Sequence, residues 1–289
     1  MNKLDRGTVQ HTLCIPLAGR MIAAQKYPEL FPDKDAERIV RELGIDLSGN
    51  ALYRLQYMWM NCLIRQYDLA SEVEGYLAGH PSATVVEMGA GLSCLRRQMG
   101  NETNPWYCLD MENVIELREK HVPKGIREHN VVCDLNDFSW FDEIDFNPAR
   151  GIVFVAGGLF YYFEKARVQH LITAMASRFP GGLIVFDAVS PLGLKGIKAE
   201  VKMGGNDSPS YFCLDNPVKE LESWSPNICN VREENFHEGY LKTGYEKTLV
   251  TKALFSVTRK LHMCFLVCAE FTSDDPIKPS EASHGKVRL

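Results

Sequence analysis

The feature that most restricts the fold of this chain is a short apolar stretch that runs directly into a glycine turn, Val85-Val-Glu-Met-Gly89-Ala-Gly91. β-Branched residues favour a buried strand, and glycine lets the backbone approach a ligand closely. The start of a following helix offers free N–H groups at the same place. This succession is typical of nucleotide-binding α/β sheets, although a tight turn that simply needs glycine fits it as well.

The apolar stretch before the turn predicts a strand at 84–88. Further apolar stretches follow it and alternate with amphipathic helical patterns at 114–120 and 164–178. They predict strands at 106–109, 131–133, 152–155 and 183–186. Continuous apolar strands that alternate with helices indicate a parallel sheet covered on both faces, which is an α/β fold. Two late stretches, 228–231 and 261–271, bring the predicted sheet to seven strands.

The residues before the sheet are predicted to be mostly helical. Apolar residues at helical spacing predict helices at 15–27 and 51–78, and Asp33 is placed to cap another helix that ends at Gly44. We therefore divide the chain into a helical lid at 1–80, a sheet domain at 81–272 with a substrate-covering insertion at 190–226, and a polar tail at 273–289.

Composition narrows the class of protein. The 289 residues carry 32 Lys and Arg against 37 Asp and Glu, a net charge of −5, so the chain lacks the basic footprint of nucleic-acid binders. The longest weakly polar run, 151–163, is shorter than the roughly 20 residues of a membrane span, and the charged N-terminus does not resemble a secretory signal. The nine cysteines are scattered, and no group of His, Cys or Asp has metal-ligand spacing. We expect reduced thiols, no metal, no nucleic-acid or membrane partner, and a cytoplasmic location.

Acidic residues end the strands next to the glycine turn. Asp110 lies about 20 residues after Gly91, where a carboxylate accepts both hydroxyls of an adenosine ribose. Asp134 ends the third strand, where it would bind the adenine amino group. Each carboxylate taken singly also fits a solvated strand end, but their order favours a ligand. An NAD-dependent enzyme would use Asp110 in the same way, yet the third glycine of its G-x-G-x-x-G pattern is Cys94 here.

Stretches in order along the chain together resemble one known family: 11–20, 64–68, 80–92, 106–118, 158–163 and 179–191. This family is the leucine carboxyl methyltransferase and tetracenomycin-type polyketide O-methyltransferase superfamily. The resemblance implies a Rossmann-like class I methyltransferase fold, with a mostly parallel seven-stranded sheet, helices on both faces and an N-terminal helical lid. It also implies S-adenosylmethionine as the methyl donor.

The resemblance further implies the residues of the cofactor site. Arg65 would pair with the methionyl carboxylate, although its spacing alone favours an exposed ion pair with Asp68. Gly89 would lie at the methionyl part and Asp110 at the ribose, and Asp134 with its neighbour would hold the adenine. The full set implied for the cofactor is Arg65, Glu87, Gly89, Ala90, Gly91, Asp110, Met111, Asp134, Leu135, Ala156 and Gly157.

The chain departs from the family at two positions. Ser93 stands where the family's glycine turn continues with an acidic residue. Gly157 replaces an acidic residue after the fourth strand, where the amino group of the donor is held. We therefore expect the cofactor affinity or the choice of substrate to differ from those of the family.

Candidates for the acceptor side come from the loops after the strands and from the lid. Tyr161 and Tyr162 are the candidate catalytic residues. Candidates for substrate contact are Arg20, Tyr161, Tyr211 and Phe212, with Trp59 and Met203 as further apolar wall residues. A carboxylate acceptor is ionised at pH 7 and needs no general base, unlike a phenol with a pKa of about 10. The sequence contains no clear base constellation, because His170 falls in mid-helix, where a non-catalytic role is favoured.

These observations predict an S-adenosylmethionine-dependent O-methyltransferase that methylates a carboxylate, or a hydroxyl, of a small polyketide-like molecule. Three alternatives stay open: methylation of a protein's C-terminal carboxylate, an NAD-dependent oxidoreductase, and a non-catalytic cofactor-binding protein. The fold alone does not separate them.

Overall fold

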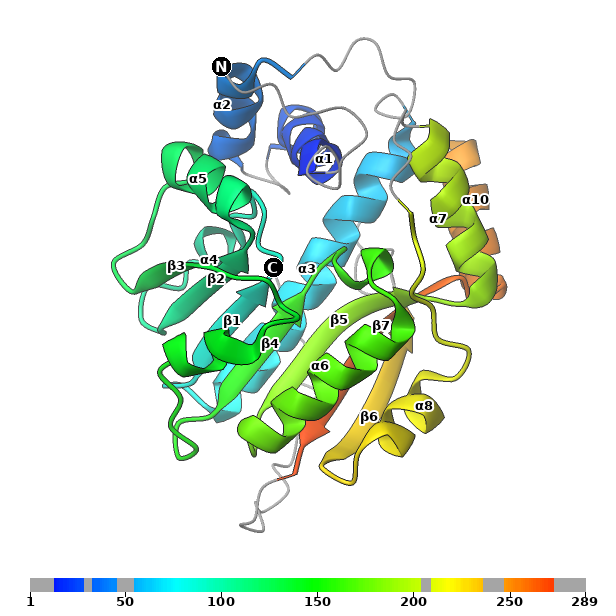
Figure 1. Ribbon diagram of the computed structural model, residues 1–289. Coiled ribbons are helices and arrows are strands. Elements are labelled where there is room, and N and C mark those ends of the chain that lie inside the picture. Colours follow the sequence, from blue (N-terminus) through cyan, green and yellow to red (C-terminus); the bar gives the residue numbers. More distant parts are fainter. Residues whose placement is uncertain (1–12, 29–32, 46–54, 204–208, 236–246, 273–289) are drawn as a thin grey trace.

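A seven-stranded sheet with the order β3-β2-β1-β4-β5-β7-β6 forms the centre of the molecule (Figure 1). The computed structural model describes residues 13–28, 33–45, 55–203, 209–235 and 247–272. The strands are β1 (Thr84–Met88), β2 (Trp106–Asp110), β3 (Glu128–Val132), β4 (Ile152–Ala156), β5 (Leu183–Val189), β6 (Ile228–Asn235) and β7 (Cys264–Phe271). Strands β1 to β5 are parallel, and β7 runs antiparallel between β5 and β6. The predicted α/β class and the seven strands are confirmed.

Both faces of the sheet are buried, because alternate residues of each strand pack in opposite directions. In β4, Phe154 packs with the helices of one face, and Val153 and Val155 pack with those of the other. The first face carries η3 (Phe138–Glu143), α6 (Lys165–Arg178) and α8 (Pro217–Trp224), and the second carries α3 (Gln56–Gly79) and α4 (Leu95–Gln98). Phe154 and Phe179 are fully buried with ring centroids 5.0 Å apart, and burying each side chain contributes about 1.5–3 kcal/mol.

Helix α3 belongs partly to the sheet and partly to the helices above it. In its second half, Leu69 and Val73 are buried against β1, β4 and β5, and the Tyr76 hydroxyl donates to the Gly181 carbonyl over 2.9 Å. Its first half packs against α1 (Cys14–Lys26) and α10 (Leu249–Lys260), and the rings of Tyr57 and Phe255 lie 4.9 Å apart. One continuous helix therefore joins the predicted lid to the sheet.

The helices α1, α2 (Lys34–Leu43), α7 (Pro191–Met203) and α10 lie beyond the carboxyl ends of the parallel strands (Figure 1). The cap predicted at Asp33 is confirmed, because its carboxylate accepts the N–H groups of Asp35 and Ala36. Gly44 ends this helix at a φ of 63°. Helix α5 (Glu112–His121) follows β2, and the short η4 (Phe160–Tyr162) follows β4.

The structure corrects several predicted boundaries. β3 begins at Glu128 rather than at 131, because this edge strand starts with three polar residues and so lacks a continuous apolar run. The predicted insertion at 190–226 contains α7, a helix that the sequence analysis did not predict because its two internal glycines weaken the helical pattern. α10 was not predicted, and β7 starts at Cys264. Part of the predicted helix 51–78 and the tail 273–289 fall outside the described residues.

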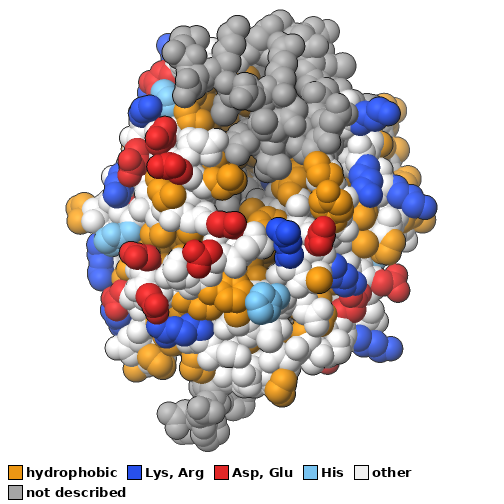
Figure 2. Space-filling view, viewed as in Figure 1, with side chains coloured by type: hydrophobic (Ala, Val, Ile, Leu, Met, Phe, Trp, Pro, Cys, Tyr) orange, Lys and Arg blue, Asp and Glu red, His pale blue; other side chains and the backbone are white. Residues whose placement is uncertain are grey.

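Acidic and basic side chains are interspersed on the face seen in Figure 2. No helix in the described segments is long and apolar enough to cross a membrane. The nine cysteines form no disulfide with one another in the structure.

Candidate active site

A cavity of about 440 Å³ opens at the carboxyl ends of β1, β2, β4 and β5. The glycine turn and the first residues after β2 line one side, α7 and α10 line the opposite side, and α3 passes between them (Figure 1). The predicted site residues that line it are Arg20, Arg65, Glu87, Gly89, Ala90, Gly91, Asp110, Met111, Gly157, Tyr161 and Tyr162. The fold thus brings together residues from distant parts of the chain.

The glycine turn has a backbone shape that other residues rarely adopt. Gly89 and Gly91 have φ angles of 61° and 51°. A Cβ atom on Gly89 would lie 2.5 Å from Cδ1 of Leu159, and one on Gly91 would lie 2.7 Å from Cδ2 of Leu13. Both positions therefore favour glycine, chiefly for its backbone conformation.

Two buried arginines hold the carbonyl groups of this turn. Arg20 Nη1 donates to the Leu92 carbonyl over 2.6 Å, and Arg118 Nη1 donates to the carbonyls of Gly91 and Ser93 over 3.2 and 2.8 Å. The Arg118 guanidinium is fixed in turn by Glu128, 2.9 Å away. Sequence analysis missed Arg118, since a helical arginine followed by a strand glutamate gives no local signal of a buried pair.

Asp110 occupies the strand end where a ribose ligand was predicted. Its carboxylate accepts the Gly91 N–H at Oδ2 and the Met111 N–H at Oδ1, each over 2.8 Å. Burial raises the pKa of Asp110, and the two N–H groups oppose that rise. These bonds hold the carboxylate in one orientation at the cavity wall and leave lone pairs for a ligand.

Arg65 lies at another part of the cavity wall and pairs with Asp187 of β5. Nη1 of Arg65 is 3.2 Å from Asp187 Oδ2, which also accepts the Tyr161 hydroxyl over 2.6 Å. The Gly158 N–H donates to Asp187 Oδ1 over 2.6 Å. The Asp187 side chain is 1% exposed and that of Arg65 is 18% exposed, so the guanidinium can be reached from the cavity.

Asp187 is a site residue that the sequence analysis missed. The rule that singled out Asp110 and Asp134, an acidic residue at the end of a predicted parallel strand, applies to it equally. Burial and the adjacent carboxylate raise the pKa of Tyr161 well above its ordinary value, so this phenol stays neutral and donates a proton to the hydrogen bond.

Glu87 lies beneath the glycine turn, at the edge of the cavity. Its carboxylate accepts the indole N–H of Trp106 over 3.2 Å. Burial raises the pKa of Glu87, against the opposing charge of Arg118.

Three residues implied for the cofactor do not line this cavity. Asp134 is exposed, and its Oδ1 accepts the backbone and side-chain N–H groups of Asn136. Leu135 and Ala156 are buried in the core of one sheet face. Their roles at the adenine and beside the donor stay predictions.

Several candidate wall residues pack elsewhere. Phe212, predicted as a wall residue, does not line this cavity, because its ring is fully buried between Phe160 and Phe186. Tyr211 is 48% exposed and lies outside the cavity. Trp59 is a core residue of the α1, α3 and α10 cluster, and the side chain of Met203 lies outside the described residues.

The end of the cavity away from the glycine turn is mainly apolar. Its side chains include Met58, Ile197, Leu254, Val257 and Met263. Helix α7 reaches it because it packs closely against the chain before β7, where a Cβ on Gly193 would lie 2.0 Å from the Met263 carbonyl oxygen. None of the described lining residues is a histidine, and His170 is exposed on α6.

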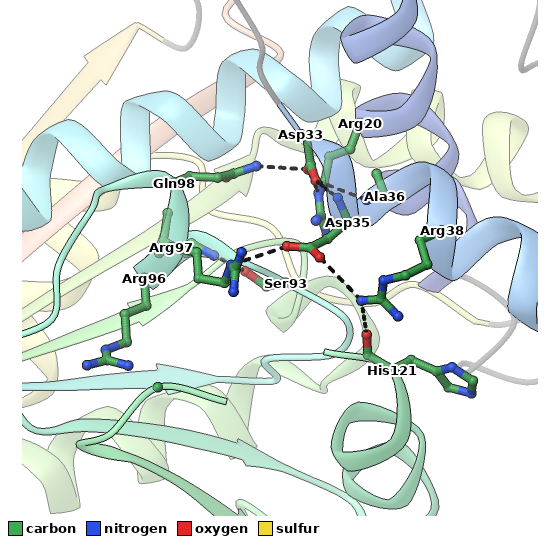
Figure 3. A network of polar contacts seen from close by, with 12 residues as sticks. Arg20, Asp33, Asp35, Ala36, Arg38, Ser93, Arg96, Arg97, Gln98 and His121 are labelled. Carbon is green, nitrogen blue, oxygen red and sulfur yellow. Dashed lines mark hydrogen bonds and ion pairs between the residues drawn. The ribbon is translucent and has the colours of Figure 1, made fainter. Parts of the chain in front are cut away.

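A polar network ties the N-terminal helices to the turn (Figure 3). Arg20 Nε lies 2.7 Å from Asp33 Oδ2, which also accepts the Gln98 side-chain amide over 3.1 Å. Beside this pair, Asp35 contacts Arg97 and Arg38. Arg20 thus links α1 and the start of α2 to the glycine turn.

The strand order and the glycine turn above a strand-end acid define a class I methyltransferase fold. A proposed methyltransferase from Thermobifida fusca YX has a TM-score of 0.59 at 10% identity, over 93% of this chain and 97% of that one. A DUF574-family protein from Streptomyces avermitilis has a TM-score of 0.50 at 11% identity, over 82% and 89% of the two chains.

Sequence comparison places the chain within this class. No protein-family profile matches it. The tetracenomycin polyketide synthesis O-methyltransferase TcmP of Streptomyces glaucescens is 26% identical over 222 residues, which cover 76% of this chain and 80% of TcmP. The chain is thus similar to a tetracenomycin-type O-methyltransferase, the family that its motifs resemble.

Proposed function

We propose that the protein is an S-adenosylmethionine-dependent O-methyltransferase whose acceptor is a carboxylate oxygen of a small polyketide-like molecule. One observation carries the proposal: the glycine turn, the fixed Asp110 carboxylate and the reachable Arg65 guanidinium line one cavity at the strand ends. The similarity to TcmP supports the transfer of a methyl group to oxygen.

The polar side chains that line the cavity fit S-adenosylmethionine. Asp110 presents a carboxylate to the ribose hydroxyls, and Arg65 presents a guanidinium to the methionyl carboxylate. Gly89 leaves room for the methionyl chain, since a Cβ there would already contact Leu159. Asp187 acts on Arg65 by holding its guanidinium at the cavity wall.

When bound, the cofactor supplies an activated methyl group, and the protein supplies alignment and exclusion of water. A carboxylate acceptor is ionised at neutral pH and attacks without a general base. This agrees with Tyr161, which is held neutral as a donor to Asp187, and with the lack of a histidine among the described lining residues. A hydroxyl acceptor would need a base at this place.

The short helix after the glycine turn disfavours a dinucleotide. α4 comprises only Leu95–Gln98, and the buried Cys94 occupies the position of the third glycine. A pyrophosphate site normally uses that glycine and a longer helix packed closely on the strand.

Calorimetric titration with S-adenosylhomocysteine and, separately, with NAD tests the proposal. We expect micromolar affinity for S-adenosylhomocysteine and no binding of NAD. Binding of NAD alone would contradict it. Mass spectrometry of aromatic carboxylic acids incubated with S-adenosylmethionine then tests whether a methyl ester forms.

A further inference from the structure

Gly91 is held at both of its backbone polar groups. Its N–H donates to Asp110 Oδ2 over 2.8 Å, and its carbonyl accepts Nη1 of Arg118 over 3.2 Å. Glycine has more backbone freedom than any other residue, and Gly91 has a φ of 51°. The direction of its N–H, and with it the orientation of the Asp110 carboxylate, therefore depends on groups that hold the turn from outside.

All three guanidinium nitrogens of Arg118 have partners. Nη1 also donates to the Ser93 carbonyl over 2.8 Å, Nη2 to Glu128 Oε1 over 2.9 Å and Nε to Asn130 Oδ1 over 3.2 Å. The Arg118 side chain is buried together with that of Glu128. Because a guanidinium is planar and rigid, its two contacts with β3 fix the direction in which Nη1 points at the turn.

Stability alone does not account for a charged pair at this place. Taking two charges out of water costs about as much free energy as their attraction returns, so apolar residues of similar volume would pack equally well. Only a donor can bind the carbonyls of Gly91 and Ser93, and the guanidinium of Arg118 binds both of them and Glu128 together. The particular contribution of this arginine is therefore to hold the turn.

We propose that Arg118 is a positioning residue for the ribose of the cofactor. By holding the Gly91 carbonyl it keeps the Gly91 N–H on Asp110, and so it fixes the carboxylate that faces the ribose hydroxyls. Arg118 is not among the residues that line the cavity, so it acts through the turn and not by touching the ligand. This inference rests on the proposed function, in which Asp110 binds the ribose.

S-adenosylhomocysteine and its 2′,3′-dideoxy derivative, which lacks both ribose hydroxyls, test the proposal by calorimetry. We expect the wild-type protein to prefer S-adenosylhomocysteine by about 10- to 100-fold, the range of hydrogen bonds to a charged group. Arg118→Lys keeps the positive charge but loses the fork of donors, and it is expected to reduce this preference at least about threefold. A role in stability alone would leave the ratio of the two affinities unchanged.

Arg96→Lys is the matched control. Arg96 is also buried and lies 3.5 Å from Glu128 Oε2, yet in the described part of the chain its side chain donates to no carbonyl of the turn. Figure 3 shows this side chain pointing away from the Arg20–Asp33 pair. Arg96→Lys therefore disturbs the same buried anion and should keep the full preference for the ribose hydroxyls.

Two further variants test whether Arg118 acts through Asp110. Asp110→Ala is expected to abolish the preference, and Arg118→Lys added to it should change the ratio of affinities no further, because the two residues act in series. Arg118→Met, which removes every donor, should bring the preference down to that of Asp110→Ala. Circular dichroism reports that each variant is folded, and Arg118→Lys is the variant that leaves no buried anion unpaired.

The outcomes separate the two proposals. If the wild-type protein does not bind S-adenosylhomocysteine, the proposed function fails and this inference fails with it. If it binds S-adenosylhomocysteine, the inference alone is overturned when the wild-type protein shows no preference or when folded Arg118→Lys keeps the full preference. An equal loss in Arg96→Lys, or a further loss when Arg118→Lys is added to Asp110→Ala, would overturn it as well.

Discussion

At the scale of single residues, the cavity is organised by charged groups that other groups hold in place. Backbone N–H groups fix the Asp110 carboxylate, and Asp187 fixes the Arg65 guanidinium. Both Asp110 and Arg65 can still make further hydrogen bonds to a ligand. A site preorganised in this way binds a ligand without first having to order its own side chains.

Replacing Asp110 tests the ribose end. Asp110→Ala is expected to weaken S-adenosylhomocysteine binding by about 10- to 100-fold, since a hydrogen bond to a charged group is worth about 1.5–3 kcal/mol. Calorimetry measures the change. Asp142→Ala, at a carboxylate 85% exposed to solvent, is the matched control and should leave the affinity as it is. An unchanged affinity in folded Asp110→Ala would remove this residue from the site.

Replacing Arg65 tests the methionyl end. Arg65→Ala is expected to weaken S-adenosylhomocysteine binding by about 10- to 100-fold through loss of a charge-assisted bond. It should leave the affinity for adenosine, which has no carboxylate, nearly unchanged. Arg178→Ala on the exposed part of α6 is the control. An equal loss of affinity for adenosine would show that Arg65 acts in some other way.

At the scale of elements, the buried Arg20–Asp33 pair joins α1 and α2 to the glycine turn. Asp33→Ala would leave Arg20 buried without its anion and remove the cap of α2. We expect it to lower the free energy of unfolding by about 3–5 kcal/mol. Urea unfolding measures this. Asp142→Ala should change the free energy by less than about 0.5 kcal/mol, and an equally small effect at Asp33 would contradict the account.

The same pair predicts a pH dependence. Burial alone would raise the pKa of Asp33, but the charge and hydrogen bond of Arg20 and the N–H groups of the cap lower it below its ordinary value of 3.8. The contribution of Asp33 to stability is therefore complete above about pH 4 and is lost as the pH falls through the lowered pKa. The stability difference between wild type and Asp33→Asn should shrink over that acidic range. A difference that stays constant down to about pH 2 would speak against a lowered pKa.

The sequence predicted those elements whose pattern is set by local burial. The apolar runs were sufficient to predict β1, β4 and β5, and the capping residues were sufficient to predict α2. The edge strand β3 and the glycine-containing α7 were misread, because contacts distant in sequence stabilise them. The same holds at the site: Asp110 was predictable from its strand end, whereas the Arg118–Glu128 pair beneath the turn exists only once the fold is formed.

At the scale of the whole molecule, binding at the cavity should stabilise the entire fold. The lining comes from α1, α3, α7, α10 and four strand ends, so a ligand there bridges elements that would separate on unfolding. A ligand at 100 times its Kd adds about 2.7 kcal/mol. We therefore expect S-adenosylhomocysteine to raise the Tm by roughly 5 °C in a thermal unfolding experiment. NAD at the same concentration should leave the Tm unchanged, and a shift with NAD alone would contradict the proposal.

A crystal structure of the protein with S-adenosylhomocysteine tests the central claim most directly. The account predicts the ribose hydroxyls on the Asp110 carboxylate and the methionyl carboxylate on the Arg65 guanidinium, with the sulfur facing the apolar end of the cavity. A ligand bound outside this cavity, or bound within it without contact to Asp110 and Arg65, would contradict the account.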